Sequence, residues 1–191
     1  MRAHFSYPNG GNMLIEVIVI GLLVQAVLWK KISLDLDYLK TMLGILALLL
    51  VLRFIIRLNP QAPQTIYRLQ GPLIIGLSLL LARQKPRLGF ILFSIGLFLN
   101  GLMLALYGRM PVDPSALVQA GQESVLKLLI QNQSTSHCLM TGGLQAYLGD
   151  WIPLPKTYPL ARVISPGDIL MSLGLAYLLI LQPIEKEMSH D

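Results

Sequence analysis

The sequence predicts an all-α polytopic membrane protein with about five transmembrane helices and an interfacial helical cap between spans four and five. Composition is the first observation, since 54% of the 191 residues are hydrophobic and only 13% are charged. A soluble domain carries about 25% charged residues. The second observation is that the apolar residues form long blocks bounded by charges, and a span needs roughly 17–25 such residues. Residues 1–191 are expected to form a single integral membrane domain.

The predicted spans cover about residues 13–29, 40–58, 66–82, 88–107 and 168–182. The apolar run of the first span is too long for a typical signal peptide, and the residues that follow contain no Ala-x-Ala cleavage site, so we interpret it as retained. Arg53 and Arg57 in the second span are one helical turn apart and can extend to the same membrane surface. Pro72 lies near the start of the third span, where proline is tolerated. The fourth span is the clearest, because it contains no charged residue.

The long connector at residues 108–167 is expected to form the cap on the membrane surface. Residues 115–131 are predicted to form one amphipathic helix, whose apolar face comprises Leu117, Val125, Leu128 and Leu129. A second apolar stretch covers residues 137–152. Pro153 and Pro155 follow it, which favours a turn and an extended exit.

The distribution of Lys and Arg predicts the orientation. If the N-terminus lies outside, short connectors on the cytoplasmic side carry seven of these residues and those outside carry four. The seven are Lys30, Lys31, Lys40, Arg83, Lys85, Arg87 and Lys186, and the four are Arg2, Arg53, Arg57 and Arg68. Because basic residues accumulate in cytoplasmic connectors, we expect the cap outside and the C-terminus in the cytoplasm.

Several functional classes find no support in the sequence. The net charge is +5, but no basic stripe with interleaved aromatic residues is present, so nucleic-acid binding is not expected. Cys138 is the single cysteine, which excludes an internal disulfide and a multi-cysteine metal site. The chain has no P-loop, dinucleotide-binding, zinc-protease or Ser-hydrolase motif. We therefore predict no metal site and no catalytic residue, identify no cofactor, and favour a protein that is not an enzyme.

Five polar residues at or near the cap are candidate ligand-binding residues, and each has a structural alternative. They are Asn100, Arg109, His137, Asp150 and Asp168. Asn100 could pair two helices, because Gly96 and Gly101 permit their close approach. Asp168 could cap the fifth span, and Asp150 could cap a turn. Arg109 could be an interfacial anchor, and an isolated histidine such as His137 is more often structural or solvated than catalytic.

The functional alternative requires Arg109, His137, Asp150 and Asp168 to converge under the cap. Such a cluster could hold a lipid headgroup or another polar ligand. Arg109 suits this role, because its planar guanidinium can contact a phosphate through two parallel hydrogen bonds.

Three segments of the second half resemble a known family. Gly-Arg-Met-Pro-Val at 108–112, Tyr-Leu-Gly-Asp-Trp-Ile-Pro-Leu at 147–154 and Val-Ile-Ser-Pro-Gly-Asp-Ile-Leu at 163–170 resemble an uncharacterised family of small bacterial multi-pass membrane proteins, domain of unknown function fifty-three seventeen. The resemblance is strongest over residues 95–182. The matching positions are Asn100, Arg109, Met110, Pro111, Gly149, Asp150, Ser165, Gly167 and Asp168. It implies residence in the bacterial plasma membrane and no known activity.

The chain also departs from the pattern of that family. Pro166 stands where the family usually has isoleucine, and Gly142-Gly143-Leu144 stands where polar or charged residues often precede the Leu-Gly-Asp motif. His137 matches a family histidine only across a one-residue gap. About twelve additional residues precede the first span. These departures argue against a ligand site of the family's type.

Two classes of function follow from these observations. The favoured one is an accessory or structural subunit of a membrane complex, with membrane lipid and other membrane protein subunits as partners. The alternative is a lipid- or small-solute-binding or transport protein, or a membrane-embedded lipid enzyme, that uses the polar residues under the extracytoplasmic cap. Small size and the lack of a catalytic motif favour the first.

Overall fold

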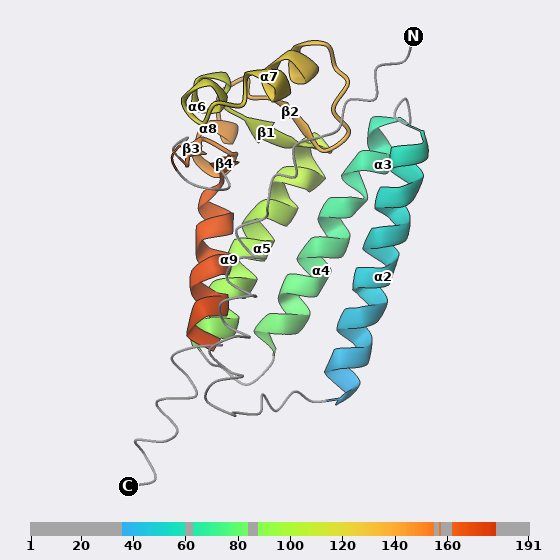
Figure 1. The fold of residues 1–191 in the computed structure, drawn as a ribbon. Coiled ribbons are helices and arrows are strands. Elements are labelled where there is room, and N and C mark those ends of the chain that lie inside the picture. Colours follow the sequence, from blue (N-terminus) through green and yellow to red (C-terminus); the bar gives the residue numbers. More distant parts are fainter. Residues whose placement is uncertain (1–35, 60–62, 84–87, 155–156, 158–161, 179–191) are drawn as a thin grey trace, which may run out of the picture.

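The computed structural model describes residues 36–59, 63–83, 88–154, 157 and 162–178, and these are mostly helical (Figure 1). The predicted first span at 13–29 and the last part of the fifth, 179–182, lie outside the described residues. The long helices are α2 (Leu36–Leu58), α4 (Gln70–Ala82), α5 (Leu88–Tyr107) and α9 (Pro166–Ala176), and a short helix, α3 (Gln64–Arg68), precedes α4.

Two helical segments are long and apolar enough to cross a membrane, judged by length and composition. They are Gln64–Ala82 and Leu88–Tyr107. The second coincides with the predicted span 88–107, because a run of helix-forming apolar residues without charge leaves little ambiguity about its ends. Helix α2 begins four residues before the predicted 40, and α9 begins two residues before the predicted 168.

The predicted span 66–82 is divided into α3 and α4 at Leu69. Pro72 has no N–H to donate to the carbonyl of Arg68, and its ring crowds that carbonyl, so the regular hydrogen-bond pattern is interrupted here. Leu69 nevertheless keeps helical dihedral angles, with φ −59° and ψ −23°. The two helices therefore act as one segment.

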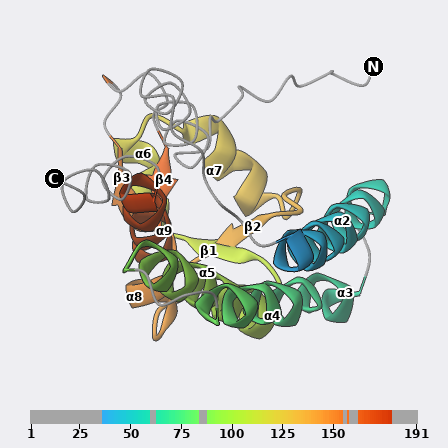
Figure 2. The same ribbon diagram turned by 90° about the horizontal axis from the view of Figure 1, so that it is seen from below.

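The long helices lie side by side in the order α2, α4, α5, α9 (Figures 1 and 2). Leu49 of α2, Ile74 of α4 and Leu104 of α5 form one buried apolar cluster between them. Ile56 of α2 packs against Tyr67 of α3 in a second cluster, nearer the cap. The cap folds over the ends of α5 and α9.

The cap contains strands as well as helices, which corrects the all-α prediction. Strand β1 (Met110–Val112) pairs in parallel with β2 (His137–Leu139), and β3 (Ile152–Pro153) pairs antiparallel with β4 (Val163–Ile164). A short helix, α8 (Gln145–Leu148), precedes β3. Strands of two or three residues leave almost no alternation in sequence, and the partners β1 and β2 are remote along the chain.

The single amphipathic helix predicted at 115–131 is wrong, since two helices occupy this region. Helix α6 (Pro114–Gln119) and α7 (Glu123–Ile130) are separated by a turn at Gly121, which has φ +73°. Gln122 N–H donates to Leu117 O at 2.8 Å and Gly121 N–H to Val118 O at 3.0 Å. This is the hydrogen-bond pattern with which a glycine in the left-handed region ends a helix.

The apolar face predicted for this region largely forms the interior of the cap. Leu117 and Leu129 are buried with Val112, and Val125 packs against them. Leu126 also contacts this cluster, whereas the predicted Leu128 does not belong to it. The turn at Gly121 rotates α7 relative to α6, so a single helical wheel assigns this position incorrectly.

Candidate functional site

The start of α9 holds the first two residues of the site. Ser165 precedes the helix, and its Oγ accepts a hydrogen bond from Asp168 N–H at 3.0 Å. Asp168 Oδ2 in turn accepts from Ser165 N–H at 3.1 Å. The pair forms a capping box, which satisfies backbone donors that the first turn of a helix leaves without partners. The capping interpretation of Asp168 is therefore confirmed.

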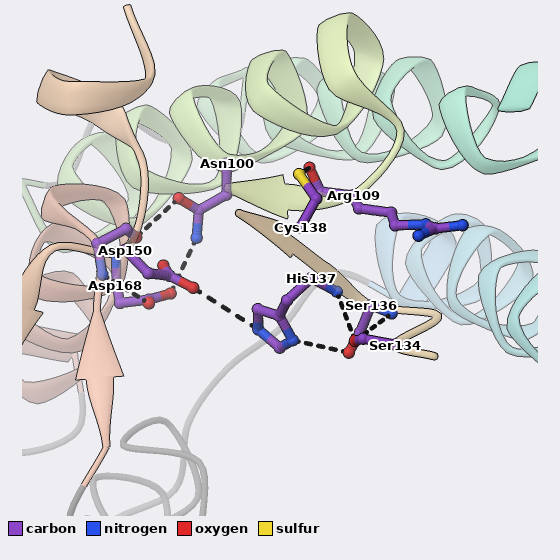
Figure 3. A network of polar contacts seen from close by, with 9 residues as sticks. Asn100, Arg109, Ser134, Ser136, His137, Cys138, Asp150 and Asp168 are labelled. Atoms are coloured by element: carbon purple, nitrogen blue, oxygen red, sulfur yellow. Dashed lines mark hydrogen bonds and ion pairs between the residues drawn. The ribbon is translucent and has the colours of Figure 1, made fainter. Parts of the chain in front are cut away.

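Asn100 of α5 joins this capping box to the neighbouring helix. Its Nδ2 donates to Asp168 Oδ1 at 2.9 Å, and its Oδ1 accepts from Ser165 Oγ at 3.0 Å (Figure 3). Ser165 is completely buried. The amide thus uses both its donor and its acceptor to hold α5 and α9 together, as the helix-pairing interpretation of Asn100 predicts.

Main-chain hydrogen bonds hold Asp150 beside strand β1. Its N–H donates to Pro111 O at 2.8 Å, and its carbonyl accepts from Asp113 N–H at 2.9 Å. A side chain on Gly149 would meet Pro111 O at 2.7 Å, so only glycine permits this approach. The Arg-Met-Pro-Val and Leu-Gly-Asp motifs therefore form one local structure, which places the Asp150 carboxyl beside His137 and near Asp168.

His137 completes the group from strand β2. Its Nε2 lies 3.6 Å from Asp150 Oδ2, and its Nδ1 lies 2.7 Å from Ser136 Oγ. The Oγ of Ser134 accepts from the main-chain N–H of His137 at 3.1 Å, which positions the residue. We call Asn100, His137, Asp150, Ser165 and Asp168 the polar cluster. Figure 3 labels all of these except Ser165, at the junction of cap and helices.

The electrostatics of the polar cluster favour the neutral forms of Asp150 and His137. Burial, and then the neighbouring Asp168, raises the pKa of Asp150 well above its usual range. Partial desolvation of the ring, and then the charge of Arg53, lowers the pKa of His137, against an opposing effect of Asp168. At 3.6 Å the His137–Asp150 contact is longer than a hydrogen bond. The cluster can therefore hold a proton on Asp150, close to a His137 side chain that is 41% exposed.

Arg109 does not belong to the polar cluster. Figure 3 shows its side chain pointing away from the other four candidate residues. Its guanidinium carbon lies 4.7 Å from the centroid of the Tyr67 ring. Its carbonyl accepts a 3.7 Å hydrogen bond from the thiol of Cys138 in strand β2. The structure thus brings Asn100, His137, Asp150 and Asp168 together, and separates Arg109 from them.

Two serines of this region were not among the candidates predicted from the sequence. Ser134 and Ser136 position the main chain and the ring of His137, and the polar run Ser-Thr-Ser-His at 134–137 is the signal that could have identified them. Within the described ranges, no group of three or more His, Cys, Asp and Glu side chains could hold a metal ion.

Comparison with known proteins shows the family of this chain. The model of a family of unknown function, DUF5317, matches residues 31–180. An uncharacterised protein of Thermotoga maritima is 34% identical over 97 residues, which cover 50% of this chain and 52% of the relative. The chain thus matches about half the length of that curated relative. No solved structure matches the chain.

Proposed function

The chain belongs to the DUF5317 family of unknown function, and on that premise we propose that it is a multi-pass protein of the bacterial plasma membrane that serves as an accessory or structural subunit of a membrane complex. The observation that carries this proposal is the polar cluster. Hydrogen bonds join Asn100, Ser165 and Asp168 to one another, and these bonds stabilise the junction of helices and cap. Such a junction supports a rigid cap that a partner subunit can recognise.

The proposed topology has five spans, with the N-terminus and the cap outside and the C-terminus in the cytoplasm. Two described segments have the required length and apolarity. Helix α2 supports a third span, because Leu50, Phe54 and Leu58 expose 60%, 61% and 70% of their surfaces. Large exposed apolar residues on one helix suit lipid or another subunit. The count of basic residues, seven against four, supports the orientation.

Cysteine labelling tests this topology. In a Cys138→Ser background, Gln119→Cys introduces a thiol on the exposed surface of α6. A membrane-impermeant maleimide should label this variant in intact cells from which the outer membrane has been removed. Labelling that requires lysis would place the cap in the cytoplasm and overturn the proposed orientation.

Purification from native membranes tests the accessory role. The chain should retain the same membrane proteins at constant stoichiometry, as measured by quantitative mass spectrometry in a mild detergent. A matched variant replaces cap-surface residues, for example Val118→Asp with Ile130→Asp, whose side chains are 46% and 63% exposed. Loss of partners from this variant would locate the interface on the cap. A wild-type chain that purifies alone contradicts the proposal.

A second candidate function rests on the pair of acids at the junction. Asp150 is 5% exposed, lies near Asp168, and contacts the half-exposed His137. A buried carboxyl beside a second acid, with an accessible imidazole, suits the binding of a small cationic solute coupled to release of the Asp150 proton, because a bound cation favours the ionised carboxylate. Isothermal titration of the purified chain with candidate amines would show binding that Asp150→Asn abolishes. Equal binding by both proteins would exclude this candidate.

A further inference from the structure

A group of three arginines lies at the cap end of the helices, on the side away from the polar cluster. Arg53 belongs to α2, Arg68 ends α3, and Arg109 follows α5. We call these residues the arginine cluster. Arg53 and Arg68 are exposed and Arg109 is half-buried, so each can reach a ligand at the surface.

A continuous series of contacts connects Arg109 with Arg53. The guanidinium of Arg109 stacks on Tyr67, whose side chain is almost completely buried. One turn further on, Gln70 Nε2 donates to Tyr67 O at 3.2 Å. Arg53 Nε donates to Gln70 Oε1 at 3.4 Å. Tyr67 and Gln70 therefore form a buried support that holds two guanidinium groups from different helices.

Arg68 is placed beside this support by Gly108. A Cβ built on Gly108 would lie 3.0 Å from Tyr67 Cβ and 3.4 Å from Arg68 Cγ. The stem of Arg68 thus lies beside Gly108, next to Arg109 in the chain. Arg109 contacts the Tyr67 ring directly, and Arg53 is joined to the same segment through Gln70.

The guanidinium groups keep most of their hydrogen-bonding capacity. Stacking on an aromatic ring uses the face of the Arg109 guanidinium and leaves its in-plane N–H donors available. Arg53 uses only Nε for its bond to Gln70. Among the described residues, no salt bridge joins any of the three to a carboxylate. The positive charge also acts on the cap, since Arg53 contributes to lowering the pKa of His137.

We propose that the arginine cluster binds the phosphate of an anionic phospholipid headgroup. Planar guanidinium groups form paired, charge-assisted hydrogen bonds with phosphate oxygens. Exposed apolar side chains continue from the cluster along the helices away from the cap, including Leu48 and Leu50 of α2 and Leu69, the last 56% exposed. Acyl chains can bury this apolar surface, whereas a free phosphate ion gains nothing from contact with it. The inference rests on the proposed membrane residence of the chain.

Lipid retention measured by native mass spectrometry tests the site. The full chain is exchanged into detergent with equimolar phosphatidylglycerol and phosphatidylcholine, and the bound lipid is released and counted. Wild-type protein should retain phosphatidylglycerol about tenfold more than phosphatidylcholine, which corresponds to about 1.4 kcal/mol. The triple variant Arg53→Gln, Arg68→Gln and Arg109→Gln should lose this preference. Arg83→Gln, an exposed arginine that follows α4 at the opposite end, is the matched control and should keep it.

Two further measurements keep the outcomes distinct. If the triple variant fails to fold, Arg109→Lys replaces it, because lysine keeps the charge but lacks the planar fork, and the preference should fall severalfold. A preference that survives in the folded variant overturns the site. Displacement of lipid by millimolar inorganic phosphate, with equal binding of the free ion, overturns the assignment to lipid. Extraction of wild-type protein from membranes by alkaline carbonate would instead contradict the proposed membrane residence.

Discussion

The α5–α9 interface is closely packed and hydrogen-bonded within the protein, whereas the α2–α3 side exposes apolar and basic side chains. At the α5–α9 interface the backbones touch: a Cβ on Gly96 would lie 2.7 Å from Met171 N, and would also clash with Gly167 O. Asn100 then bonds across the interface to Ser165 and Asp168. On the α2–α3 side, apolar side chains are exposed, and the Arg109 guanidinium stacks on the buried ring of Tyr67.

This difference separates residues that determine the fold from residues available for binding. Polar groups at the α5–α9 interface have partners within the protein, so their removal should cost stability. Guanidinium groups on the α2–α3 side keep unused donors, so their removal should cost binding and little stability. The polar residues nearest the cap are therefore not equivalent, although the sequence groups Arg109 with Asp150 and Asp168.

The largest effect is expected for Gly96→Ala. The new methyl group would meet the main chain of α9, which cannot move as a flexible side chain can, so the helices must separate. Overpacking of this kind costs about 1–3 kcal/mol. The free energy of unfolding, measured by denaturant titration in micelles, should fall by that amount.

Gly76→Ala is the matched control for this substitution. Gly76 lies in the middle of α4, and a Cβ there has no atom within 4 Å. Alanine should be neutral or stabilise the helix by about 0.5–1 kcal/mol, because glycine is the more flexible residue in the unfolded chain. Equal losses at Gly96 and Gly76 would contradict the tight packing of α5 on α9.

The next largest effect is expected for Ser165→Ala. This change removes a helix cap and the bond to Asn100 together, and loss of a cap alone costs about 0.5–2 kcal/mol. Asp168→Asn should be milder, since asparagine also accepts a backbone hydrogen bond. Thermal unfolding monitored by circular dichroism would rank the two variants. A ranking in the opposite order would show that the charge of Asp168, and not the cap, stabilises the interface.

Part of this architecture could be predicted from the sequence. The ends of α5 follow from an uncharged apolar run, and the cap of α9 follows from Ser165 and Asp168 beside Pro166. Both are local signals. The strands of the cap could not be predicted, because Met110 and His137 pair across a long stretch of chain and each strand is too short to show alternation.

The candidate site shows the same division between local and remote information. The sequence identifies Asp150 and Asp168 as unusual acids, but their approach to His137 and Asn100 depends on how strands and helices meet. The separation of Arg109 from the polar cluster could not be predicted for the same reason. Its partner Tyr67 lies in another helix, and an aromatic residue at a helix end gives no sequence signal of stacking.

A pH-dependent difference is expected for Asp150→Asn. Because burial raises the pKa of Asp150, this carboxyl stabilises the fold below its unfolded pKa, about 4, and loses that contribution as the pH rises through the folded pKa. Asparagine does not titrate, so the variant keeps its stability as the pH rises. The melting temperature of the variant minus that of wild type should therefore increase between pH 4.5 and pH 8.

His137 has the opposite dependence, because burial lowers its pKa: its contribution is present above about pH 6.5 and is lost as the pH falls. His137 is present in both wild type and Asp150→Asn, so its contribution cancels to first order from the difference between their melting temperatures. Gly76→Ala, which changes no titratable group, provides the flat reference. A difference between Asp150→Asn and wild type that is equally flat would show that Asp150 is not desolvated in the folded protein.

The smallest effect on stability is expected for Arg109→Gln, and it tests the α2–α3 side most directly. Stacking of a half-exposed guanidinium on an aromatic ring contributes about 0.5–1 kcal/mol, and Arg109 has no described carboxylate partner whose burial would add to this. The free energy of unfolding should therefore fall by less than about 1 kcal/mol. In a Tyr67→Leu background the same change should have no effect, because the ring is gone. A loss as large as that of Gly96→Ala would make Arg109 part of the packing, and the distinction between a closed interface and an open binding side would fail.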